Sequence, residues 1–101
     1  MNRQDTVKWF SKEMLKKLDA NTHKKHWRYL NDSQLFDLLN REVAELRLTL
    51  RVGQSYYDTI KEASDVANIS MMIADNARRQ VEGAAHIRAM AEKETDSHER
   101  D

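Results

Sequence analysis

The sequence contains no cysteine and no proline, and only two glycines interrupt its 101 residues. The absence of cysteine excludes disulfide bonds and thiolate metal sites, and it argues against a zinc site. Proline and glycine are the residues that most often end helices and shape turns, so a chain with so few of them favours an all-α fold. At this length we expect a single domain.

An excess of one charge and long apolar runs are also missing. The formal net charge is zero at pH 7, so no overall basic field attracts nucleic acid, and we expect no nucleic-acid partner. No apolar run approaches the roughly 20 residues that cross a membrane, and residues 1–5 are too polar to open a signal peptide. We therefore expect a soluble, cytoplasmic protein with no membrane partner.

Helical periodicity and capping signals predict three main helices. The first covers residues 4–19 and carries an apolar stripe on one side. The second begins at Asn31, which with Gln34 matches a capping box, and it ends at Gly53. The third covers about residues 57–80. The apolar stripe of the first helix consists of Val7, Phe10, Met14 and Leu18.

The C-terminal part of the chain predicts weaker structure. Gly83 is expected to break the third helix, and residues 84–91 are expected to form a short fourth helix with Ile87 and Met90 as its apolar contacts. Residues 92–101 are all polar, and they predict a disordered tail. The expected domain therefore covers residues 1–91.

The third predicted helix is apolar over more than half of its circumference, which is more than a surface helix needs. Such a helix must be covered on two sides, and a short chain offers few helices to cover it. We therefore expect a homodimer or homotetramer whose interface uses this helix. The residues that make it apolar are Val66, Ala67, Ile69, Met71, Met72 and Ile73.

Two acidic motifs lie on the second and third predicted helices: Glu42-Val-Ala-Glu45 and Glu62-Ala-Ser-Asp65. Residues three apart share one face of a helix, so each motif presents two carboxylates to the same side. Both pairs interrupt stripes that are otherwise typical of core. Burying unpaired carboxylates costs roughly several kcal/mol each, so four of them on facing seams need a compensating cation. Hard divalent ions prefer such oxygen ligands, and the motifs predict a magnesium site.

The pattern Glu-x-x-Glu, a gap of sixteen residues, then Glu-x-x-Asp resembles the signature of the MazG-like, all-α nucleoside triphosphate pyrophosphohydrolases. The run from Asp65 to Asn76, with the upstream His23-Lys24 and Trp27, is similar to the small single-domain phage and bacterial members. The resemblance spans about residues 21–79. It implies a MazG-like helical bundle that hydrolyses (deoxy)nucleoside triphosphates to the monophosphate and pyrophosphate.

The resemblance also implies roles for particular residues. By position, Glu42, Glu45, Glu62 and Asp65 are the catalytic residues and the ligands of Mg²⁺, for which Mn²⁺ is a substitute ion. Water attack at the α-phosphorus needs a positive site for the triphosphate, a water of lowered pKa and stabilisation of the leaving pyrophosphate, and magnesium supplies these. Residues 1–30 hold eight Lys or Arg against three acids, an excess that can face phosphate. The expected substrate-binding residues are Lys24, Lys25, Trp27, Arg28, Asn68, Asn76 and Arg79.

Other interpretations stay open at this point. Glu42 and Glu45 can instead form a solvated face and pair with Arg41 or Arg47. The chain is then a non-catalytic helical oligomer that acts as a protein-interaction module. Trp27 can cover the hydrophobic core or stack on a base. A carboxylate-bridged di-iron bundle usually needs Glu-x-x-His pairs, and no histidine lies three residues after a motif acid.

Overall fold

The computed structural model describes residues 1–20, 26–53 and 55–100, with side chains described as far as residue 94. These residues form three α-helices and one short 3₁₀ turn, without strands. The all-α class expected from composition is therefore confirmed. In chain order the elements are α1 (Arg3–Ala20), the 3₁₀ turn η1 (Trp27–Tyr29), α2 (Asp32–Val52) and α3 (Tyr56–Arg100).

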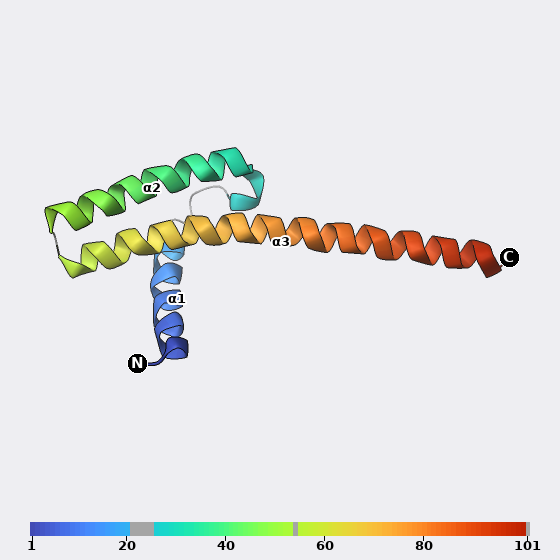
Figure 1. Ribbon diagram of the computed structural model, residues 1–101, viewed down its shortest axis with the longest axis horizontal. Coiled ribbons are helices and arrows are strands. Elements are labelled where there is room, and N and C mark those ends of the chain that lie inside the picture. Colours follow the sequence, from blue (N-terminus) through green and yellow to red (C-terminus); the bar gives the residue numbers. More distant parts are fainter. Residues whose placement is uncertain (21–25, 54, 101) are drawn as a thin grey trace.

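Helices α2 and α3 form an antiparallel hairpin in which α2 covers the N-terminal half of α3 (Figure 1). Helix α1 contacts the same half of α3 but runs crosswise to the hairpin, so the three helices do not lie parallel. The C-terminal half of α3 projects beyond all of them. This projection gives the chain a radius of gyration of 19.6 Å, whereas a compact domain of this length has about 13 Å.

The bounds of α2 follow from local signals at both ends. The N–H of Gln34 donates to Oδ1 of Asn31 at 2.8 Å, and the N–H of Asn31 donates to Oε1 of Gln34 at 2.9 Å, which completes the predicted capping box. At the other end Gly53 adopts the left-handed conformation, with φ 69° and ψ 39°, and its N–H donates to the carbonyl of Thr49. A residue with a Cβ is strained at this φ, so glycine is suited to turn the chain into α3.

Helix α3 does not end where the sequence predicts. It runs without interruption through Gly83 to Arg100, so the expected break and the separate short helix over residues 84–91 are wrong. The segment predicted as a disordered tail, residues 92–101, is helical as far as Arg100. A single glycine inside a helix costs only about 1 kcal/mol, and the surrounding Ala, Glu, Arg and Lys residues are good helix formers.

The interior of the single chain is thin. Leu35 is the only apolar side chain that is fully buried among the described residues, and Thr49, Ser64 and Asn68 are the buried polar ones. On α1, the predicted stripe is half-buried at Phe10, Met14 and Leu18, whereas Val7 is 65% exposed because α1 crosses α3 only with its C-terminal part. The chain therefore leaves much apolar surface uncovered.

Within the described part of the chain, no helix combines the length and apolar character needed to cross a membrane.

Candidate metal centre

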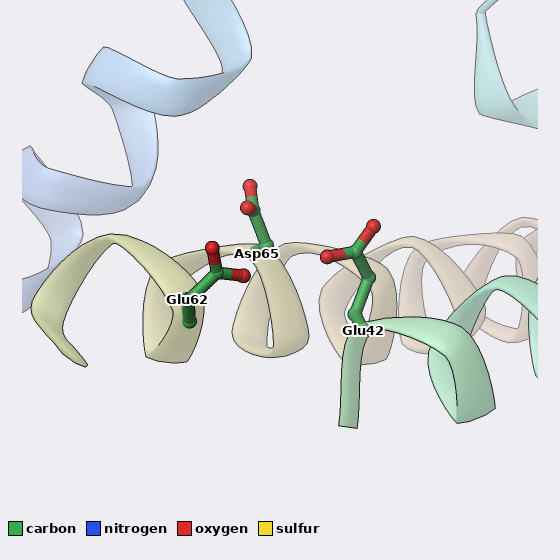
Figure 2. A group of neighbouring side chains, drawn as sticks. All are labelled: Glu42, Glu62 and Asp65. Carbon is green, nitrogen blue, oxygen red and sulfur yellow. The ribbon is translucent and has the colours of Figure 1, made fainter. Parts of the chain in front are cut away.

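Three of the four predicted acids meet between α2 and α3. Glu42 comes from the middle of α2, and Glu62 and Asp65 come from successive turns of α3; Figure 2 shows the three carboxylates grouped together. One carboxylate oxygen of each residue lies within 4.8 Å of the others. We call Glu42, Glu62 and Asp65 the acidic triad. It unites residues from two helices, as the spacing of the motifs predicts.

The hairpin explains why these positions meet. Glu42 precedes the Gly53 turn by nearly the same length of chain as Glu62 and Asp65 follow it, so antiparallel pairing brings them to one level. The three-residue step between Glu62 and Asp65 then directs both side chains to the same face of α3. The buried Leu35 and Thr49, which share the α3-facing side of α2 with Glu42, keep the two helices in this register.

The fourth predicted ligand, Glu45, does not belong to the group of three oxygens. It lies one turn beyond Glu42 on α2, and its side chain is exposed. Its carboxylate is nevertheless near enough to raise the pKa of both Glu42 and Glu62 by charge repulsion. Glu45 therefore flanks the acidic triad.

Burial and repulsion make the triad electrostatically unfavourable without a cation. Oε2 of Glu42 and Oε2 of Glu62 are screened from solvent and have no hydrogen-bond partner among the described residues. Burial, and then the charges of Glu45 and Asp65, raise the pKa of Glu42 to about 7. Burial is also the largest cause that raises the pKa of Glu62, with Lys17 acting in the opposite direction. The site therefore holds negative charge that Lys17 compensates only in part.

Helix α1 closes one side of this region. Nζ of Lys17 lies 3.4 Å from Oδ2 of Asp65. One turn further along α3, Nδ2 of Asn68 donates to the carbonyl of Met14 at 3.0 Å. Asn68, predicted to bind substrate, is thus 4% exposed and engaged with the backbone of α1. Its Oδ1 has no partner in the described part of the chain.

The raised pKa of Glu42 leads to a prediction about stability and pH. Because the pKa of Glu42 is about 7 in the folded protein and the ordinary value of a glutamate is 4.5, the folded state retains a proton that the unfolded state loses. The stability that Glu42 contributes is then fully present below pH 4.5 and is lost as pH rises through about 7. We expect the metal-free protein in chelator to lose about 2 kcal/mol, or several degrees in melting temperature, between pH 5 and 7.5.

Thermal melts at fixed protein concentration measure this dependence, and Glu42→Gln is the control. The amide has no proton to lose in this range, so the melting temperature of the variant should fall less than that of the wild type, with the remaining fall coming from Glu62. An equal fall in both proteins would show that a group other than Glu42 is responsible.

A second polar cluster holds η1 against α3, about three turns beyond the triad. The indole N–H of Trp27 donates to Oδ2 of Asp75 at 2.8 Å, and His26 stacks on the indole ring with centroids 4.2 Å apart. Hydrogen bonds from Arg78, and next from Trp27, hold the pKa of Asp75 below its ordinary value. Trp27, a predicted base platform, is therefore half-buried, with its N–H and one ring face already in contact with the protein.

The neighbouring amide supports the same turn. Nδ2 of Asn76 donates to the carbonyls of Trp27 and Leu30 at 3.4 and 3.3 Å, and Arg79 donates to Oδ1 of Asn76. Arg28 lies with its guanidinium 5.4 Å from the ring centroid of Tyr29. Arg28, Asn76 and Arg79 also line an open pocket of about 600 Å³ with Tyr29, Leu30, Asn31, Asp32, Ala77 and Gln80.

The predicted residues thus divide between two places. Glu42, Glu62 and Asp65 form the triad, while Trp27, Arg28, Asn76 and Arg79 gather around η1. Lys24 and Lys25 lie outside the described residues. Sequence reasoning missed the contact of Lys17 with Asp65 and the hydrogen bond that Asp75 accepts from Trp27. Both contacts depend on how α1 and η1 cross α3.

No family model matches this chain, and searches of curated proteins and of solved structures return no match.

Proposed function

We propose that this chain hydrolyses (deoxy)nucleoside triphosphates to the monophosphate and pyrophosphate in a magnesium-dependent reaction, and that it acts as a homo-oligomer. The observation that carries the proposal is the convergence of three carboxylates from two helices, with oxygens within 4.8 Å. These acids occupy positions of the Glu-x-x-Glu and Glu-x-x-Asp pattern, which is similar to that of MazG-like enzymes. Chemistry and pattern therefore support the same activity.

The donor set of the triad suits magnesium. All three side chains offer carboxylate oxygens, which hard divalent ions prefer, and two of these oxygens lack a hydrogen-bond partner among the described residues. When bound, Mg²⁺ would supply positive charge for the triphosphate and lower the pKa of the attacking water. The three side chains would hold the ion. Glu42, Glu62 and Asp65 stand on packed helices, which fix ligands more precisely than loops do.

The pocket beside η1 offers a second set of contacts for the substrate. Arg28 and Arg79 bring cationic donors to it, and Asn76 brings an amide. From Asp65 to Asn76 the distance along a helix is about 16 Å, so these groups suit a part of an extended nucleotide remote from the reacting phosphorus. We assign them to substrate binding on this basis.

The surface area of the chain supports an oligomer. The accessible surface is 8443 Å², whereas a compact monomer of this size exposes about 6,000 Å². The excess of about 2,500 Å² has the size that obligate dimers bury. Part of it comes from the projecting half of α3, where Val81, Ile87 and Met90 are exposed.

Helix α2 carries an apolar seam suited to such an interface. Its members recur with alternating steps of three and four residues, the spacing of helices that pack side by side. The seam lies roughly 100° around α2 from the face that contacts α3, so a second hairpin packed on it would complete a four-helix arrangement. The seam consists of Phe36, Leu39, Val43, Leu46 and Leu50, of which Phe36, Val43 and Leu50 are exposed in the single chain.

Two measurements test the proposed activity. Because magnesium binds the folded state, we expect saturating Mg²⁺ to raise the melting temperature by several degrees relative to chelator. A panel of canonical and modified triphosphates should release pyrophosphate, with no release of inorganic phosphate, only when the metal is present.

The non-catalytic interaction module predicts the opposite pattern. A helical oligomer without a metal site melts at the same temperature in Mg²⁺ and in chelator, and it releases no pyrophosphate from any member of the panel. That combination would reject the hydrolase proposal. The apolar seam of α2 would still support an oligomer.

A further inference from the structure

Lys17 occupies a defined place beside the acidic triad. Its Nζ lies 3.4 Å from Oδ2 of Asp65, with the two side chains 30% and 21% exposed. The backbone of α1 is fixed at the same point, because Asn68 donates to the carbonyl of Met14 at 3.0 Å. Met14 and Lys17 are one turn apart on α1, as Asp65 and Asn68 are on α3. The ion pair thus belongs to a two-turn contact between the helices.

The charges around Asp65 give Lys17 two alternative partners. In the metal-free protein its ammonium compensates part of the negative charge of the triad. A divalent cation held by the same carboxylates would bring like charge to the oxygen that Lys17 now contacts, and the two cations would repel each other. Lysine has a flexible four-carbon stem and three donors, so its ammonium can move without moving α1.

We propose that Lys17 is a phosphate-binding residue, which rests on Asp65 in the metal-free protein and contacts a phosphate oxygen of the substrate when a divalent cation occupies the triad. This inference rests on the proposed function, and it gives a particular role to one member of the basic excess in residues 1–30. The substrate brings negative charge to the metal, and therefore to the region that the ammonium already occupies. Charge-assisted hydrogen bonds to phosphate are the contacts that a lysine makes best.

Lys17→Met tests the proposal through two binding equilibria that need no turnover. Calorimetric titration with Mg²⁺ alone should show binding at least about threefold tighter than in the wild type, because the competing cation is gone. Titration with inorganic pyrophosphate in saturating Mg²⁺ should show binding about tenfold weaker, because one charged contact is lost. The two affinities change in opposite directions, which a general loss of structure does not produce.

Lys16→Met is the matched control. Lys16 is the neighbouring residue, it is exposed, and it pairs with Glu13 on its own helix. Its loss should leave both affinities unchanged. Circular dichroism checks the folding of each variant, and Lys17→Gln provides a second neutral variant with the same expected changes should the methionine variant fail to fold.

The outcomes separate this inference from the proposed function. Unchanged affinities in a folded Lys17 variant, or weaker binding of Mg²⁺, overturn the role of Lys17 while the hydrolase proposal stands. A wild-type protein that binds no Mg²⁺ in the first titration overturns both.

Discussion

Glu62→Gln is expected to lower magnesium-dependent pyrophosphate release by at least about 100-fold while raising the melting temperature of the metal-free protein. The amide keeps the shape of the side chain but removes one of the three carboxylates of the acidic triad. Removing the charge also relieves the burial and repulsion that raise the pKa of Glu62 in the folded state. Activity and stability should therefore change in opposite directions.

Glu82→Gln is the control for this experiment. Glu82 lies on the same helix, its side chain is 65% exposed, and it contacts Arg78 at 3.9 Å, remote from the triad. We expect normal turnover and nearly the same melting temperature. Pyrophosphate release and thermal melts with Mg²⁺ or chelator are measured for all three proteins. If Glu62→Gln hydrolyses triphosphates at the wild-type rate, the triad is not the catalytic metal centre.

The sequence predicts the parts of this fold that local signals determine. The start of α2 follows from the Asn31 and Gln34 side chains, and its end follows from a glycine at a positive φ. The meeting of Glu42 with Glu62 and Asp65 also follows, because a three-residue step fixes the face of a helix and a short turn makes the hairpin antiparallel. These inferences need only spacing and capping.

The remaining features depend on contacts between distant residues. Whether α3 continues past Gly83 is decided by a balance of about 1 kcal/mol that no single residue reveals. The crosswise path of α1 pairs Lys17 with Asp65 and brings the carbonyl of Met14 to the Asn68 amide, and both contacts join residues about 50 positions apart in the sequence. Glu45 shares the predicted row with Glu42, yet its side chain is exposed and lies outside the group of three oxygens, although its charge still acts on Glu42 and Glu62. Periodicity alone does not resolve such differences.

Leu50→Glu is expected to dissociate the proposed homo-oligomer and to lower the melting temperature by about 10 °C or more. Leu50 belongs to the apolar seam of α2 and is 61% exposed in the single chain. In a symmetric interface the substitution places a carboxylate in the contact twice, where it loses hydration without a partner. Since Leu35 is the only fully buried apolar side chain described, the separated chain retains little core to hold it folded.

Leu48→Glu makes the comparison specific to the seam. Leu48 is also 61% exposed and lies on the same helix, but it points to a different side of α2. Both substitutions add the same charge near the C-terminus of α2, so any general helix effect is shared. Light scattering after size-exclusion chromatography, with thermal melts at one protein concentration, should show an intact oligomer for Leu48→Glu alone. A monomeric wild type would contradict the seam as an interface. Equal behaviour of the two variants would contradict it too, because the two exposed leucines would then be equivalent.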